Sequence, residues 1–200
     1  MTARARTIAV LAIVAGGAVS VISSTQTWLD VTLEAGATTS LAVPGATAFP
    51  LLAPLSLAAL ALGLALTVAG RVLRYVFGVI AVAIGSTLLF AAARIGFAVP
   101  LDAAASAVTE ATGLAGDAAL AQLVDALVPT PWPFVASVAG LAVAVGGLLT
   151  LASGHAWRSA GRRYRTDAVP AGTAPRPHDS LRDRAIDSWD DLSHGDDPTA

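Results

Sequence analysis

Four long apolar runs constrain the fold of this chain more than any other feature. They cover residues 8–24, 51–70, 72–93 and 133–153. Each is close to the ~20 residues with which an α-helix crosses a hydrocarbon layer about 30 Å thick. Because lipid cannot pair backbone N–H and C=O groups, we expect all four runs to be helices. The sequence therefore predicts an all-α membrane protein built around a four-transmembrane-helix bundle.

Composition supports this class, since the chain is 55% hydrophobic and only 13% charged. Small residues also recur four positions apart within the apolar runs, which lets helix backbones approach closely. Alanine is so frequent that some of these pairs arise by chance, and they give weak support for a compact bundle. The pairs are Ala12 and Gly16, Ala59 and Gly63, Ala81 and Gly85, and the series Ala136, Gly140 and Ala144.

The first run has a second interpretation. Arg4 and Arg6 before a short apolar stretch also fit a signal peptide. Against this, no A-x-A cleavage pattern follows, and the run exits through VISSTQTW. The distribution of charge does not separate the two interpretations.

The arginines predict the orientation. All twelve basic residues are arginine, and with four crossings eleven of them fall on the same side as both termini. Loops rich in Arg stay in the cytoplasm, so both termini are predicted to be cytoplasmic in the inner cell membrane. Arg74 lies in the first turn of the third run, where it can snorkel to the interface. The acidic residues of the two outer loops lie on the opposite side: Asp30, Glu34, Asp102, Glu110, Asp117 and Asp125.

The outer loops carry two patterns. Apolar and polar residues alternate from Trp28 to Leu33 and again from Thr39 to Val43, which predicts a small extracytoplasmic β-hairpin. From Leu101 to Val128, apolar residues recur at helical spacing, which predicts one or two amphipathic helices on the outer surface.

Two residues near the outer side are candidates for contact with a ligand. Arg94 is the one basic residue on that side, and it either snorkels, pairs with a carboxylate such as Asp102, or meets an anionic group of a substrate. Trp28 is the other candidate. Its default role, like that of Trp132 and Trp157, is to anchor the chain at the membrane interface.

No pattern indicates catalysis. The chain lacks cysteine and contains no nucleophile elbow, zinc-protease, P-loop or dinucleotide motif. His155, His178 and His194 are too dispersed to suggest a metal site. The basic RSAGRRYR stretch follows an apolar run directly, which favours contact with anionic lipid over nucleic acid. We therefore expect no enzyme activity, no cofactor, no metal and no nucleic-acid partner.

The chain is predicted to divide into three parts. The four-pass domain is predicted to cover residues 1–165 and a flexible linker residues 166–178. A cytoplasmic tail, residues 179–200, then contains a short amphipathic helix that begins near Ser180. Acidic residues late in a helix oppose its dipole, and a helix this short is marginal alone. The tail therefore fits a segment that becomes ordered on a protein partner, with a merely solvated tail as the alternative.

The predicted contacts with that partner combine a Trp anchor with an acidic rim. The candidate residues are Trp189, Asp190, Asp191, Leu192, Gly195, Asp197, Pro198 and Thr199.

The ending DSWDDLSHGDDPT resembles the D-x-W-D-x-L-x-x-G-x-D-P-T ending of the tryptophan-biosynthesis-associated membrane proteins of actinobacteria. The TQTW exit of the first run, the segment 50–70, the TPWP entry to the last run and HAWRSAGRRY support the resemblance. Genes of that family lie among those for tryptophan synthesis, so the resemblance implies a link to the pathway. It implies no catalytic residue, ligand or activity.

Two hypotheses for function follow. The first is a membrane accessory or scaffold protein whose tail binds a cytoplasmic partner, such as a pathway enzyme. The second is a small transporter or exporter of tryptophan or a related aromatic metabolite, acting either alone or as a homo-oligomer. They differ in where the functional residues lie: in the tail for the first, in the membrane interior and at Arg94 for the second.

Overall fold

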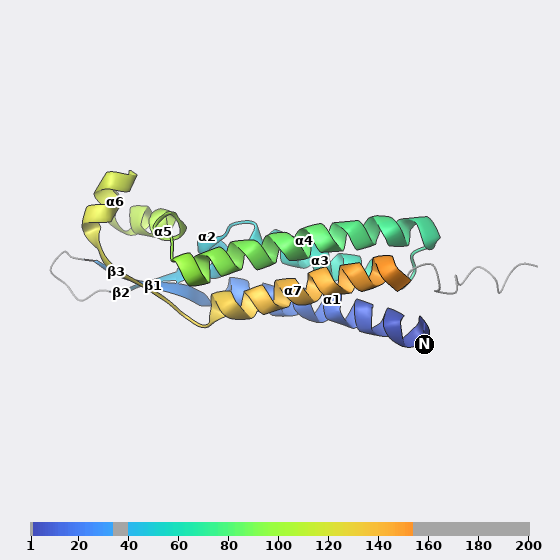
Figure 1. The fold of residues 1–200 in the computed structure, drawn as a ribbon. Helices are drawn as coiled ribbons and strands as arrows, with labels where there is room; N and C mark the ends of the chain where they lie inside the picture. The colour runs from blue at the N-terminus through green and yellow to red at the C-terminus, as the bar shows by residue number, and fades with distance from the viewer. Residues whose placement is uncertain (1, 34–39, 154–200) are drawn as a thin grey trace, which may run out of the picture. The chain divides into compact units, whose positions relative to one another are not determined.

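The computed structural model describes residues 2–33 and 40–153. Residues 1, 34–39 and 154–200 lie outside the described residues. The last of these ranges contains the whole of the second compact unit, Gly161–Ala200. Within the first unit, four helices lie lengthwise beside one another, and a small sheet with shorter helices gathers at one end (Figure 1). The four are α1 (Thr2–Ser24), α3 (Leu52–Ala65), α4 (Arg71–Ala98) and α7 (Trp132–Ser153).

Three of these helices are long and apolar enough to cross a membrane. They span Arg4–Ser24 within α1, all 28 residues of α4 and all 22 residues of α7, with mean hydropathies of 2.1 to 2.3. Many of their large apolar side chains point outward, among them Leu11, Phe90 and Val138, which are all more than half exposed. A surface of this kind is stable in lipid and not in water. The prediction of a mostly helical membrane protein is confirmed.

The second predicted run is shorter than the sequence indicated. Its helix, α3, ends at Ala65 after 14 residues, which at ~1.5 Å per residue gives about 21 Å. Beyond Ala65 the chain forms turns rather than continuing the helix, although residues 66–69 remain mostly apolar. The structure therefore has three helices of spanning length among the described residues, and a count of four is not reached on length alone.

Small residues bring α4 and α7 into close contact. A Cβ atom on Gly85 would lie 2.3 Å from the backbone nitrogen of Ala144, and one on Gly140 would lie 2.6 Å from that of Leu89. No side chain fits at such distances, so these two positions require glycine. The pairs predicted at Ala81 and Gly85 and along residues 136–144 thus do lie in a helix interface. Gly16 has the same role between α1 and α7, where its Cβ would lie 2.7 Å from the carbonyl oxygen of Ala139.

The sheet has three antiparallel strands in the order β2-β1-β3. The hairpin strands β1 (Thr27–Leu33) and β2 (Ser40–Pro44) confirm the predicted hairpin. The third strand, β3 (Val124–Pro129), pairs with the other edge of β1, so that Val31 lies between Leu41 and Leu127.

The loop from Leu101 to Val128 is helical only in part. Helices α5 (Asp102–Thr112) and α6 (Asp117–Leu123) confirm the amphipathic pattern, and Gly113 and Gly116 separate them with φ angles of 73° and 109°. The prediction of helix up to Val128 is wrong, because the last residues form β3. A strand there gives hydrogen-bond partners to the free edge of β1, which an isolated helix would not do.

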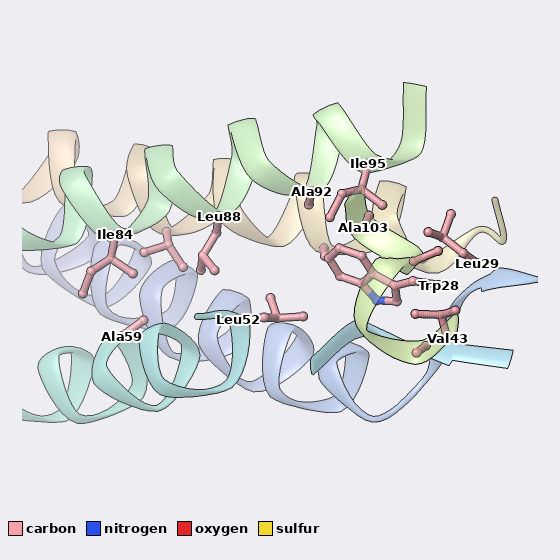
Figure 2. Close-up of a cluster of buried hydrophobic side chains, with 14 of the residues drawn as sticks. Trp28, Leu29, Val43, Leu52, Ala59, Ile84, Leu88, Ala92, Ile95 and Ala103 are labelled. Carbon is pink, nitrogen blue, oxygen red and sulfur yellow. The ribbon is translucent and has the colours of Figure 1, made fainter. Parts of the chain in front are cut away.

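One apolar core continues from the bundle into the sheet end. Ala59 of α3 with Ile84 and Leu88 of α4 form its bundle part, and Trp28 and Val43 belong to its sheet part (Figure 2). The short helix α2 (Gly45–Ala48) and α5 pack beside the sheet and close this end. The sheet is therefore packed onto the bundle as part of the same unit.

Candidate functional site

The TQTW and TPWP segments meet at the base of the sheet. The backbone nitrogen of Thr130 donates to the carbonyl oxygen of Trp28 at 2.9 Å. The hydroxyl of Thr130 donates to the carbonyl oxygen of Thr27 at 2.6 Å. On the other side, the hydroxyl of Ser23 donates to the carbonyl oxygen of Trp132 at 3.3 Å. Two motifs far apart in the sequence thus join the exit of α1 to the entry of α7.

Trp28 is the centre of this junction. Its side chain is fully buried, and the indole Nε1 donates to the carbonyl oxygen of Ser23 at 3.0 Å and to its hydroxyl at 3.1 Å. A Cβ on Gly45 would lie 2.5 Å from the same nitrogen, so the start of α2 closes directly over the ring. The expectation of an interfacial anchor is wrong for Trp28, because the ring is satisfied inside the protein. No surface of the ring is open to a ligand, so its candidacy as a ligand contact has no support here.

Trp132 is half-buried at the start of α7, and Trp157 lies outside the described residues. The anchoring role therefore remains a prediction for both.

Arg94 pairs with Asp102. The guanidinium nitrogen Nη2 lies 2.9 Å from the carboxylate oxygen Oδ2, and each side chain is 62% exposed. The pair links α4 to the first residue of α5 across the turn between them. Of the interpretations of Arg94, pairing with the carboxylate of Asp102 is the one that the structure confirms.

A small pocket of about 150 Å³ opens beside this ion pair. The turn that borders it contains Val99, whose φ of 43° places a β-branched residue in the left-handed region. Trp28 does not line this pocket, although Ile95 and Ala103, which do, belong to the same buried core as Trp28. The lining residues come from α2 and the residue after it, the end of α4, the turn that follows it, and the start of α5: Ala48, Phe49, Ala91, Arg94, Ile95, Pro100, Asp102 and Ala103.

Two arginines serve a different purpose at the opposite end of the bundle. Arg6 of α1 donates to the carbonyl oxygen of Thr67, and Arg74 of α4 donates to that of Ala69 at 3.1 Å. The side chain of Arg74 is only 3% exposed, so the expectation that it snorkels outward is wrong. It turns inward because the end of α3 leaves carbonyl groups without helical partners, and a guanidinium can satisfy them.

The remaining predicted sites fall outside the described ranges. All the tail candidates, from Trp189 to Thr199, belong to residues 154–200. Over the described ranges, no three His, Cys, Asp or Glu side chains gather in a way that could hold a metal ion. The absence of catalysis, cofactors and metals in the whole chain remains a prediction.

Sequence reasoning missed the pocket and the roles of Ser23 and Gly45. Phe49 and Ala103 lie more than fifty residues apart, and no local sequence pattern predicts that they line the same cavity. The sequence held a weak indication that Ser23 contacts Trp28, since Ser23 precedes Trp28 by five residues across the end of a helix.

A family model described as tryptophan-associated transmembrane protein matches residues 10–199. The chain belongs to this family. No curated protein and no solved structure matches the chain significantly. Membership in the tryptophan-associated family agrees with the three apolar helices of spanning length, and it links the chain to tryptophan. The match includes the TQTW and TPWP segments that meet at Trp28, and it continues to the terminal DPT residues.

Proposed function

We propose that this protein is a membrane accessory or scaffold protein of tryptophan biosynthesis whose cytoplasmic tail binds a protein partner. The observation that carries the proposal is the extent of the family match, which continues to residue 199, well beyond the end of α7 at Ser153. If the membrane domain alone performed the function, the family's shared pattern would have no reason to extend to the last residues. An enzyme of the pathway is the partner that the link to tryptophan favours.

The proposal includes the topology. We take α3 as a fourth crossing and place both termini in the cytoplasm of the inner membrane. In support, the end where α1 begins and α3 ends carries the arginines Arg4, Arg6, Arg71 and Arg74 (Figure 1). The sheet end carries the described acidic residues Asp30, Asp102, Glu110 and Asp125, with Arg94 as its one described arginine. A separation of this kind is typical of a membrane protein whose arginine-rich end faces the cytoplasm.

The packing of the bundle favours a scaffold over a transporter. The backbones of α4 and α7 touch at Gly85 and Gly140, which leaves no room for a solute between them. The described charged side chains of the spanning helices lie near their ends, at Arg4, Arg6, Arg71, Arg74 and Arg94. Proton and ion relays usually place ionisable groups deeper in the membrane.

The tail is proposed to bind through Trp189 and Leu192, which enter an apolar pocket of the partner. Asp190, Asp191 and Asp197 meet basic groups around that pocket, and Gly195, Pro198 and Thr199 complete the ending. A buried Trp anchor often contributes about 2 kcal/mol or more, roughly thirtyfold in affinity. Charges on the rim mostly change the association rate and its dependence on salt.

The test is a binding assay between the full-length protein in detergent and the purified enzymes of tryptophan synthesis. Trp189→Ala should lose the partner at every salt concentration, whereas Asp190→Asn should weaken capture mainly at low salt. Trp132→Ala, which alters a Trp at the sheet end, is the matched control and should keep the partner. If a chain truncated after Thr166 keeps every interaction of the full chain, the proposal is wrong.

A transporter of tryptophan or a related aromatic metabolite remains the second candidate. One observation favours it, namely the pocket beside Arg94 at the sheet end. Transport predicts uptake or efflux of labelled tryptophan by proteoliposomes, which a scaffold would not show.

A further inference from the structure

We infer that the pocket beside Arg94 and Asp102 binds a free α-amino acid with an apolar side chain, holding its carboxylate and ammonium groups with the two charged residues. The inference goes beyond the proposed function, because no residue of the tail takes part in it. It concerns the sheet end of the membrane domain, where α2, α4 and α5 meet.

The ion pair is open to a ligand. Arg94 and Asp102 are each 62% exposed, and they are joined by one contact, between Nη2 and Oδ2 at 2.9 Å. A guanidinium has five N–H donors and a carboxylate two acceptor oxygens, so one shared hydrogen bond leaves capacity on both groups. An exposed pair of this kind is weak, and a ligand can insert into it at little cost.

The signs of the two charges select the ligand class. A simple anion drawn to Arg94 would meet the negative charge of Asp102, and a simple cation drawn to Asp102 would meet Arg94. A ligand whose two charged groups lie close together satisfies both residues at once, and an α-amino acid carries its ammonium and carboxylate groups on a single carbon. A carboxylate also matches the planar fork of Arg, which can bind both of its oxygens.

The rest of the pocket is apolar and small. Phe49, Ile95 and Ala103 line it together with other apolar groups, and its volume is about 150 Å³. Pockets for drug-sized ligands measure roughly 300–1,000 Å³, so this one suits a small metabolite rather than a peptide. With the charged end of the ligand at the rim, the apolar side chain would enter the cavity against the ring of Phe49.

The walls of the pocket are positioned by well-packed elements. Arg94 lies on α4, which is held against α7 along its length. Ile95 and Ala103 are nearly buried, with 5% and 6% of their surfaces exposed. Val99 adopts its left-handed conformation directly before Pro100, which lines the pocket. Strained residues of this kind persist where the surroundings fix them, and they are frequent at binding sites.

The test is equilibrium binding to the full-length protein purified in detergent, with labelled L-tryptophan as the first probe. Tryptamine lacks the carboxylate and indolepropionate lacks the ammonium group, so each should bind about tenfold more weakly or worse. Equal binding of all three would show that only the indole is recognised and would overturn the inference. So would the absence of saturable binding for tryptophan, phenylalanine and leucine alike.

Substitutions in the pocket test whether tryptophan binds there. Arg94→Gln and Asp102→Asn should each reduce the affinity for tryptophan about tenfold. Glu110→Gln, on the exposed side of the same helix as Asp102, is the matched control and should change nothing. Ala103→Leu should fill the cavity, so that tryptophan is lost while alanine, with its small side chain, still binds. Unchanged tryptophan binding in both charge variants would contradict the inference.

A zwitterionic lipid headgroup offers the same pair of charges, and the experiment separates the two sources. Tryptophan binding is repeated in nanodiscs of phosphatidylglycerol alone and in nanodiscs that also contain phosphatidylethanolamine. Binding in both, with at most weak competition, supports a free amino acid. Binding of phosphatidylethanolamine alone would overturn it. The chain truncated after Thr166 should still bind tryptophan, so this inference and the proposed role of the tail can fail independently.

Discussion

Trp28 joins the end of α1, the first strand and the start of α2 through a single indole ring. Its nitrogen donates two hydrogen bonds to Ser23, and its ring fills the space beneath Gly45. A residue that looks from the sequence like a membrane anchor is therefore a core residue. Sequence reasoning could not find this, because the buried cluster that contains Trp28 also contains residues of α5, which follow much later in the chain.

Trp28→Ala should lower the free energy of unfolding by about 3–5 kcal/mol, since it removes a large buried side chain. Trp28→Phe should cost less, about 1–2 kcal/mol, because it keeps most of the ring and loses the donor to Ser23. Thermal unfolding in detergent measures both. An unchanged midpoint for Trp28→Ala would show that the ring is not part of the core.

Arg94→Gln should have little effect on folding. The pair with Asp102 is more than half exposed, and such pairs contribute roughly 0–1 kcal/mol. The amount of protein in the membrane should therefore stay constant, whereas on the transporter hypothesis any tryptophan-linked phenotype is lost. Immunoblots of membrane fractions and growth on limiting tryptophan measure the two effects. A normal phenotype would favour a purely structural role for the pair.

Among the elements, α4 and α7 form the tightest contact because glycines face each other along it. Gly85→Ser should destabilise the bundle by about 1–3 kcal/mol, since its Cβ would lie 2.3 Å from the backbone nitrogen of Ala144. The matched control is Gly70→Ser, because a Cβ there has nothing within 4 Å and serine is well suited to the N-cap of α4. Unfolding midpoints compare the two, and equal values would contradict the close packing.

The end of α3 depends on side chains from its neighbours. Arg74→Met removes a charged donor from the carbonyl oxygen of Ala69 and should cost about 1–3 kcal/mol. The matched control is Arg71→Met, which changes an exposed arginine one turn away and should cost much less. A larger loss for Arg71→Met in the same unfolding assay would mean that Arg74 does not hold this end.

Prediction from the sequence succeeded for elements that local patterns define. The long helices and the hairpin follow from apolar length and from alternation over a few residues. The third strand was missed because its pairing with β1 joins segments about a hundred residues apart. The length of α3 was overestimated because residues 66–69 are apolar whether or not they continue the helix. The pocket could not be foreseen, since it exists only where α2, α4 and α5 come together.

At the scale of the whole molecule, the proposed topology can be tested on the intact cell. The chain has no cysteine, so single cysteines can be introduced at Thr38, Ala115 and Gly172. Ala115 is preferable to Gly116, whose φ of 109° would strain any side chain. An impermeant thiol reagent should label the first two positions and not the third. Labelling of Gly172 in intact cells would reverse the orientation.

Two of the four lengthwise helices, α3 and α4, differ in length by a factor of two. At ~1.5 Å per residue, α4 measures about 42 Å and α3 about 21 Å. If α3 crosses the membrane, the apolar belt around the protein is narrower at α3 than elsewhere. Either the bilayer becomes thinner beside α3, or another protein molecule packs against α3 and shields it from lipid. Such a local deformation of the bilayer costs elastic energy, and the total cost is lower when two copies of the protein lie side by side than when they are apart. The short helix would then make association depend on lipid chain length, with the greatest tendency to cluster in the thickest membranes.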